Sequence, residues 1–230
     1  MIEVRGVRKV YGKTIALDGV DVRVEPGEIV GLLGHNGAGK TTLMKLLAGQ
    51  LLPSAGTITV GGVDVTTSPS EARARLGYVP EEPALWEYLS AREFLEFVVG
   101  VRGTGDVDAA LAVAGLGADA DRLIREYSQG MRRKTAIAAA IVARPPALVL
   151  DEALNGLDPP SALRVRDHLR LLCGDGAAVL LSTHVLETVE RLADRVVLLA
   201  RGRVVEDVRV QDLGEGGLEA LFRERITRDR

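Results

Sequence analysis

The sequence has few aromatic residues and almost no cysteine. Phe, Trp and Tyr together make up 3% of its 230 residues, and Cys173 is the one cysteine. A single cysteine excludes an internal disulfide, which is compatible with a reducing compartment. With so few aromatic rings, the core has to be built from Ala, Val, Leu and Ile. This composition suits a parallel sheet that is covered by helices.

A strong net charge and long apolar runs are lacking as well. The formal net charge is −3, so no overall basic field argues for binding to nucleic acid. The sequence has no run of about 18 apolar residues, which is the length needed to cross a bilayer. Residues 1–5 lack the apolar segment of a signal peptide. We therefore expect one large domain, or a core with a subdomain. Any membrane role needs a partner chain.

The stretch Gly34–Thr41 has the pattern G-x-x-x-x-G-K-[ST] of a phosphate-binding loop. The apolar run Ile29–Leu33 before it is typical of a buried strand, and residues 42–48 after it have helical spacing. Glycines let backbone N–H groups turn toward phosphate oxygens, and the following helix adds its free N–H groups and positive dipole end. The alternative is a chance glycine-rich turn, which the flanking strand and helix disfavour.

Within this loop we expect Lys40 to reach the β- and γ-phosphates of a nucleotide and Thr41 to place its hydroxyl on Mg²⁺. His35 occupies a variable position, so its side chain is assigned no chemistry. The residues predicted to bind the nucleotide here are Gly34, His35, Asn36, Gly37, Ala38, Gly39, Lys40, Thr41 and Thr42.

Strand patterns surround this loop, and helical patterns follow. Residues 20–24 alternate between valine and polar residues, as in a half-buried strand. Residues 57–65 repeat the pattern around a hairpin turn at Gly61-Gly62. From about 84 to 143 the pattern is helical, beginning with a capping box at Ser90–Glu93. Two further helices are expected at 106–114 and 129–143, the last stopped by Pro145-Pro146.

After residue 143 strands and helices alternate again. The predicted strands are 147–150 and 177–181, the helices 161–172 and 186–193, the closing hairpin 196–206 and the tail helix 218–230. We therefore divide the chain into four parts: a β region with the phosphate loop (1–80), a helical insert (81–143), the rest of the core (144–215) and a C-terminal helix or tail (216–230).

Two acidic residues, Asp151 and Glu152, end one of the buried strands. Open parallel sheets bind their ligands at this end of the strands. A carboxylate at Asp151 can hold Mg²⁺, and Glu152 can orient or deprotonate an attacking water. The alternative is an ordinary strand-to-loop transition with two solvated acids. The phosphate loop favours the functional interpretation, because a P-loop ATPase requires such a strand.

From Tyr11 to about Leu221 the chain resembles the nucleotide-binding subunit of ATP-binding cassette (ABC) transporters. The motifs stand in the order of that family. Tyr11 resembles the aromatic residue that stacks on adenine, Gly34–Thr42 is similar to Walker A, and Tyr127–Met131 occupies the place of the signature. Ala147–Asp151 resembles Walker B, Glu152 the catalytic glutamate, Asn155–Asp158 the D-loop and His184 the switch histidine.

This resemblance implies an α/β fold with a P-loop NTPase (RecA-like) core, an N-terminal antiparallel β region and an inserted α-helical subdomain. It implies catalytic roles for Glu152, His184 and Lys40, and Mg²⁺ binding by Thr41, Glu81 and Asp151. To the residues that bind ATP it adds Tyr11, Ser128, Gly130 and Asp158.

The resemblance also implies partners and a location. Two chains, identical or different, would sandwich two ATP molecules, each between Walker A of one chain and the signature of the other. A separate integral-membrane permease would dock near Glu81 and the helices after it. The chain would then be cytoplasmic, held at the inner face of the cell membrane, with no nucleic-acid partner.

Three side-chain groups have a second interpretation. Ser128 can be a simple N-cap of a core helix instead of an anion site facing another chain. A neutral imidazole at His184 can hydrogen-bond a phosphate or a positioned water, whereas His168 on its amphipathic helix is expected to be structural or solvated. The basic run 132–134 is expected to be a solvated helix face or part of a dimer rim rather than a nucleic-acid patch.

The motifs depart from the family pattern in several places. Glu81 stands where many members have the glutamine of the Q-loop, and it adds negative charge beside a triphosphate. The signature has Tyr127, Gln129 and Met131 in place of its usual residues, and Ala153 replaces a common proline. These forms, with the short tail, resemble a bacterial ABC-2-type branch that powers export of drugs, antibiotics, lipids or polymers.

Three other functions would share some of these features. A soluble ABC ATPase that acts on nucleic acid or the ribosome usually carries paired cassettes, long coiled coils or basic arms, and none is visible. A small-molecule kinase or GTPase would share only the phosphate loop, and the guanine-specific Asn-Lys-x-Asp motif is absent. A nucleotide-binding module without catalysis conflicts with the intact Glu152 and His184. We therefore expect an ATPase that energises a membrane permease, in the exporter branch.

Overall fold

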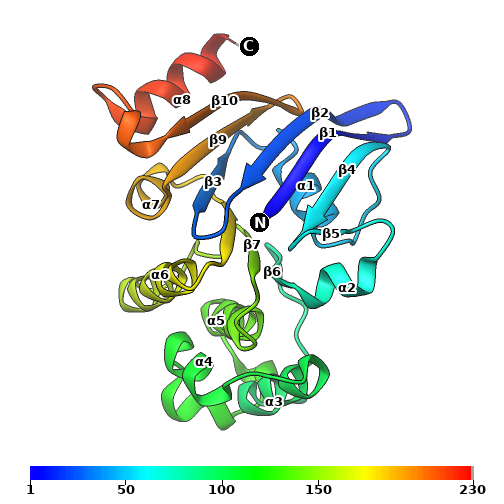
Figure 1. Cartoon of the computed structure of the whole chain (residues 1–230). Coiled ribbons are helices and arrows are strands. Elements are labelled where there is room, and N and C mark those ends of the chain that lie inside the picture. The colour runs from blue at the N-terminus through cyan, green and yellow to red at the C-terminus, as the bar shows by residue number, and fades with distance from the viewer. Residues whose placement is uncertain (229–230) are drawn as a thin grey trace.

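The computed structural model describes residues 1–228, so the last two residues of the tail predicted at 218–230 lie outside the described residues. A six-stranded sheet forms the centre (Figure 1). Its strands, in spatial order, are β10 (Arg203–Arg209), β9 (Arg195–Ala200), β3 (Ile29–Leu33), β8 (Ala178–Ser182), β7 (Ala147–Asp151) and β6 (Leu76–Val79). Neighbouring pairs from β9 to β6 are parallel, and β10 pairs antiparallel with β9 at one edge.

The three central strands explain where the site lies. β3, β7 and β8 are buried at every position, as their apolar runs predict. Because β3, β8 and β7 are parallel neighbours, their carboxyl ends open at the same edge of the sheet. The phosphate loop, the Asp151-Glu152 pair and the segment from Ser182 to His184 therefore all start at that edge.

A second, antiparallel sheet is built from the N-terminal region. Its strands, in spatial order, are β2 (Thr14–Val24), β1 (Ile2–Tyr11), β4 (Ala55–Val60) and β5 (Val63–Asp64). Val60 pairs with Val63 across Gly61-Gly62, which confirms the predicted hairpin. Helix α1 (Lys40–Leu47) packs against β2, β4 and β7 and so joins the two sheets through a shared core.

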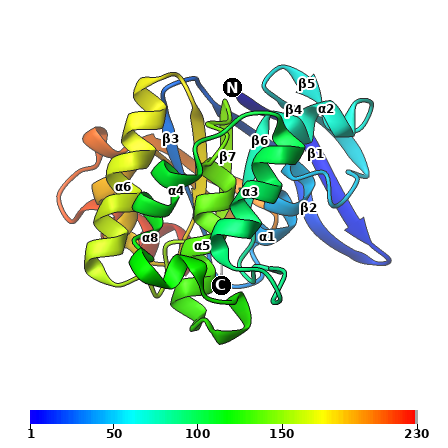
Figure 2. The same ribbon diagram turned by 90° about the horizontal axis from the view of Figure 1, so that it is seen from below.

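Helices cover the face of the central sheet that lies opposite α1 and the antiparallel sheet. They are α3 (Ala91–Arg102), α4 (Val107–Ala114), α5 (Gln129–Ile141), α6 (Pro159–Gly174) and α7 (Leu186–Leu192). Figures 1 and 2 show α3, α4 and α5 gathered together, and α4 also contacts α6. The last helix, α8 (Gly217–Arg228), contacts α7. Within residues 1–228, none of the helices has the length and apolar character needed to cross a bilayer.

The helical region follows its sequence signals closely, with small differences. Ser90 Oγ accepts a hydrogen bond from Glu93 N–H at 3.2 Å, and Glu93 Oε2 accepts one from Ser90 N–H at 2.8 Å. This is the capping box that starts α3. Helix α5 ends at Ile141, before the predicted 143, and Arg144 adopts a left-handed φ of 48° ahead of Pro145.

Two short elements, α2 (Pro69–Ala74) and β6, have no counterpart in the sequence prediction. The predicted fold class is confirmed: a P-loop NTPase core, an antiparallel β region and a group of helices between β6 and β7. The division of the chain at residues 80, 143 and 215 into separate structural units stays a prediction.

Candidate functional site

The phosphate loop is held in a shape that requires glycine at two positions. A Cβ atom on Gly34 would lie 2.3 Å from the backbone oxygen of Leu199. Gly39 has φ 109°, in the region that favours glycine, and is the N-cap of α1. No side chain of the described residues caps α1. The first N–H groups of this helix are therefore available to an anion.

Lys40 lies inside this loop. It is 7% exposed, and its Nζ donates to the backbone oxygens of Gly34 at 2.7 Å and His35 at 3.4 Å. The ammonium thus lies against the loop at the helix N-terminus, where phosphate oxygens can compete for it. The ring of His35 forms a hydrogen bond with the next residue, with Nδ1 2.7 Å from the backbone oxygen of Asn36.

Asp151 is fully buried at the end of β7. Burial raises the pKa of its carboxyl, and the Ser182 and Thr41 hydroxyls oppose that rise. Oδ1 accepts a hydrogen bond from Ser182 Oγ at 2.6 Å, whereas Oδ2 is buried with no hydrogen-bond partner among residues 1–225, whose side chains are described. A carboxylate oxygen without a partner, beside a threonine hydroxyl, is the hard-oxygen donor set that suits Mg²⁺.

No further acidic or histidine ligands gather there. In the part of the chain that the structure describes, no three His, Cys, Asp or Glu residues are grouped as a metal site. Glu81, the third predicted Mg²⁺ residue, is exposed, and its backbone oxygen accepts a hydrogen bond from Arg133 at 3.1 Å.

Glu152 has a strained backbone and an anchored side chain. Its φ is 50°, one of three positive values among non-glycine residues 1–228. Its N–H donates to Ser182 O at 3.1 Å and to Ser182 Oγ at 3.0 Å. Its Oε2 accepts a hydrogen bond from Asn155 Nδ2 and lies 3.1 Å from His184 Nδ1. The structure thus brings Glu152 and His184 together, as two of the predicted catalytic residues.

Three supporting residues were given no site role from the sequence: Ser182, Thr183 and Asn155, the last of which was placed only in the D-loop. Ser182 lies opposite Asp151 in the sheet register and hydrogen-bonds both acidic residues. Thr183 Oγ1 donates to Asn155 Oδ1 at 3.0 Å. The available signal was their position, since Ser182 and Thr183 directly end a buried strand at the ligand-binding edge.

The predicted adenine and signature residues lie apart from this cluster. Tyr11 ends β1 with its ring 45% exposed, and Lys9 Nζ lies 5.0 Å from the ring centroid. Ser128 is exposed and is the N-cap of α5, where it accepts a hydrogen bond from Met131 N–H at 3.3 Å. Gly130 follows in the first turn. Helix α5 packs against α3, α4 and β6, whereas α1 packs against β2, β4 and β7, so the two helix N-termini belong to different layers.

Asp158 is engaged within its own chain. It is the N-cap of α6, accepting from Ser161 N–H at 2.9 Å, and it pairs with Lys134 Nζ at 2.5 Å. Lys134, and then these α6 hydrogen bonds, hold the pKa of its carboxyl far below the usual range. The contact of Asp158 with a nucleotide stays a prediction.

The basic side chains at 132–134 are partly buried and paired rather than freely solvated, and their place on a dimer rim stays a prediction. Arg132 pairs with Glu87 at 2.8 Å, Arg133 donates to the backbone oxygens of Asn155 and Glu81, and Lys134 pairs with Asp158. Each basic side chain thus ties α5 to a neighbouring loop.

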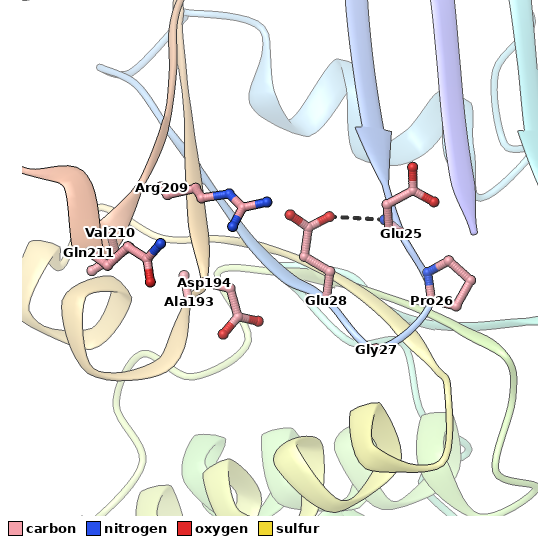
Figure 3. A pocket seen from close by; sticks show the side chains of 9 residues that line it. All are labelled: Glu25, Pro26, Gly27, Glu28, Ala193, Asp194, Arg209, Val210 and Gln211. Atoms are coloured by element: carbon pink, nitrogen blue, oxygen red, sulfur yellow. Dashed lines mark hydrogen bonds between the residues drawn. The ribbon is translucent and has the colours of Figure 1, made fainter.

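A separate hollow of about 610 Å³ opens at the opposite end of the sheet (Figure 3). It lies at the amino ends of β3 and β9, beside Glu28 and Asp194. Figure 3 shows the Arg209 guanidinium turned toward Glu28. Glu28 already pairs with Arg195 at 2.8 Å and Asp194 with Arg170 at 2.7 Å. Both carboxylates already form ion pairs with arginines and lie far from the ligand-binding edge of the sheet, so this hollow is not the candidate site.

The sequence matches known proteins over most of its length. A family model described as ABC transporter matches residues 17–155. A daunorubicin resistance ATP-binding protein, DrrA3 of Streptomyces coeruleorubidus, is 39% identical over 97% of this chain and 74% of that protein. The bacitracin transport ATP-binding protein BcrA of Enterococcus faecalis is 35% identical over 93% of this chain and 70% of that protein. The chain thus spans about three quarters or less of these relatives.

The fold matches solved structures equally well. A structure of an ATP-binding subunit of an ABC transporter superposes with a TM-score of 0.92 at 31% identity, covering 98% of this chain and 99% of that one. The dimeric bacterial ABC transporter cassette MJ0796 superposes with a TM-score of 0.82 at 24% identity, covering 91% of this chain and 98% of that one. At that lower identity, the likeness to MJ0796 shows the fold alone.

Proposed function

The chain belongs to the ABC transporter family as an ATP-binding, ATP-hydrolysing subunit, and from this premise we propose that it energises a separate membrane exporter. One observation carries the catalytic part of the proposal. Lys40, Asp151, Glu152 and His184 all follow the carboxyl ends of three adjacent parallel strands, and Glu152 is held there by hydrogen bonds.

Each residue then has a role in hydrolysis. The loop N–H groups and Lys40 bind the phosphates and stabilise the charge that develops on them. Glu152 orients the attacking water or accepts a proton from it. His184, on the same side of the site, forms a hydrogen bond with a phosphate or with this water. Thr41 and Asp151 would hold Mg²⁺, which supplies positive charge to the phosphate oxygens when it is bound. Glu81 has its side chain exposed, and we propose that it approaches the ion only after the Q-loop moves.

The active site is completed by a second chain. Within one chain, Ser128 and Gly130 start a helix in a different layer from the phosphate loop. An exposed, serine-capped helix N-terminus is an anion site, and we assign it to the ATP of the partner subunit. Identical or different partners both satisfy this geometry.

An exposed aromatic patch marks the proposed permease surface. It consists of the exposed Trp86, Tyr88 and Phe97 with the half-buried Phe94 beside Trp86, and these four rings are half of the chain's one Trp, four Tyr and three Phe. Trp86 is 52% and Tyr88 79% exposed, and the Trp86 and Phe97 ring centroids are 4.4 Å apart. Clustered exposed rings are typical of protein interfaces. The patch follows Glu81 in the chain, so a permease docked here would hold this subunit at the inner face of the membrane.

Export is the direction that the relatives support. Their names refer to daunorubicin resistance, bacitracin transport and Nod factor export, the last at 34% identity in Cupriavidus metallidurans. We propose that this chain powers outward transport as well.

The proposal is tested by purifying the chain from its native membrane and measuring phosphate release from Mg-ATP. We expect a permease to co-purify and the complex to hydrolyse ATP. A chain with Trp86→Ser and Phe97→Ser should still bind ATP but lose the permease. Co-purification with ribosomes or nucleic acid, and not with a permease, would overturn the transport assignment.

A further inference from the structure

Asn155 occupies the gap between the Glu152 carboxylate and the segment that carries His184. Its Nδ2 donates to Glu152 Oε2 and lies 3.4 Å from His184 Nδ1. Its Oδ1 accepts a hydrogen bond from Thr183 Oγ1 at 3.0 Å. One amide group therefore connects the proposed base with the two residues that follow β8.

The Thr183 hydroxyl and the Glu152 carboxylate together decide which way this amide faces. Val185 N–H donates to Thr183 Oγ1 at 3.1 Å, so the hydroxyl hydrogen is left for Asn155 Oδ1. If the amide were flipped, its oxygen would face the Glu152 carboxylate, and two acceptors would be in contact. The amide is thus locked with its NH₂ group toward Glu152.

The backbone of Asn155 is held from two sides as well. Its N–H donates to Glu152 O at 3.2 Å, closing a turn that starts at the left-handed Glu152. Its carbonyl oxygen accepts a hydrogen bond from Arg133 of α5, which also donates to Glu81 O. The backbone that carries the amide is therefore fixed, both to the edge of the sheet at Glu152 and to helix α5, which begins at the signature residues.

The effect on Glu152 is to anchor one oxygen and leave the other available. Oε2 accepts a hydrogen bond from Asn155 Nδ2 and lies 3.1 Å from His184 Nδ1, whereas none of the residues with described side chains, 1–225, donates a hydrogen bond to Oε1. A free carboxylate rotates about its side-chain bonds, and holding one oxygen removes that freedom before the reaction begins. Oε1 can then accept the water proton.

We propose that Asn155 is a positioning residue for Glu152: its amide, oriented by Thr183, aims the carboxylate that activates the water. This inference rests on the proposed role of Glu152 in hydrolysis. It adds a second function to the D-loop segment, whose Asn155 acts within its own chain.

The test compares Asn155→Ala and Asn155→Asp in the full chain, by kcat and KM for Mg-ATP and by nucleotide binding. We expect kcat to fall about tenfold or more for Asn155→Ala, with KM and binding unchanged, because one charge-assisted hydrogen bond is lost. Asn155→Asp has nearly the same shape but sets a second carboxylate against Glu152, so its kcat should fall further, by about 100-fold.

The ranking of the two variants separates positioning from packing. If Asn155 only filled space, the isosteric Asp would be milder than Ala, and that order would overturn the inference. Gln211→Ala, an amide removed from the opposite end of the sheet, is the matched control and should keep the parent kcat. In a Glu152→Gln background, Asn155→Ala should cause no further loss in single-turnover measurements, since there is no base left to position.

Failure of the inference is distinguishable from failure of the proposed function. If Glu152→Gln abolishes turnover while both Asn155 variants match the parent, the ATPase assignment stands and the positioning role is wrong. If the parent chain, with its permease, hydrolyses no ATP, the proposed function fails and the inference fails with it.

Discussion

Removing the Ser182 hydroxyl tests how the buried end of β7 is built. Ser182 Oγ donates to Asp151 Oδ1 at 2.6 Å and accepts from Glu152 N–H at 3.0 Å. In Ser182→Ala, the Glu152 N–H keeps its bond to Ser182 O, so the main loss is the donor to a fully buried carboxylate. A hydrogen bond to a charged group contributes about 1.5–3 kcal/mol.

The expected size follows from that bond. We take about 2 kcal/mol, and a chain of this size loses about 2–4 °C of melting temperature per kcal/mol, so Ser182→Ala should melt about 4–8 °C lower. The assay is thermal unfolding followed by circular dichroism, without nucleotide. Mg²⁺-dependent ATP binding should weaken in parallel, because the same change disturbs the oxygen donors of Asp151.

Ser161→Ala is the matched control. Ser161 is also buried and its hydroxyl also donates to an aspartate, Asp158, at 2.8 Å. That carboxylate is 46% exposed and keeps Lys134 and the Ser161 N–H as partners. Ser161→Ala should therefore lower the melting temperature less than Ser182→Ala. Equal or larger destabilisation by Ser161→Ala would refute the argument from burial.

Three further outcomes are expected. Glu152→Gln should lower phosphate release about 10²–10⁴-fold while ATP still binds; turnover like that of the parent would show that Glu152 is not the base. Gly34→Ala should destabilise the fold by about 1–3 kcal/mol in urea unfolding and abolish nucleotide binding, because its Cβ would lie 2.3 Å from Leu199 O. Burial, and then the charge of Arg144, lower the pKa of His168 below its ordinary 6.5. The unfolded chain therefore takes up the proton first, and stability falls as pH drops through about 6.5. His168→Gln should lose less stability than the parent between about pH 7 and 5, and identical pH profiles would contradict this.

Local patterns predicted most of the fold. The phosphate loop, the buried central strands, the capping box at Ser90 and the hairpin at Gly61-Gly62 all depend on residues adjacent in the chain. They therefore form as predicted. The short elements α2 and β6 were missed, since six and four residues carry too little periodicity to stand out.

The site was predicted less completely than the fold. Glu152 and His184 were identified one by one, but their direct contact joins segments about 30 residues apart, as do the contacts of Asn155 with Thr183 and His184. Such a contact is set by the β7–β8 register, which no local pattern gives. The same reason explains why the pairing of residues 132–134 was not predicted, since their partners lie on other loops.

The most direct test of the central claim, that one active site is built from two chains, is a mixing experiment. Lys40→Ala removes the phosphate-loop cation, and Gly130→Asp puts a negative charge at the signature helix. Each variant alone should release no phosphate above background. In a dimer of two copies of this chain, mixing the variants in equal amounts with the permease should recover activity, since about a quarter of the sites then pair an intact loop with an intact signature. Parent-like hydrolysis by the Gly130→Asp variant alone would contradict the account.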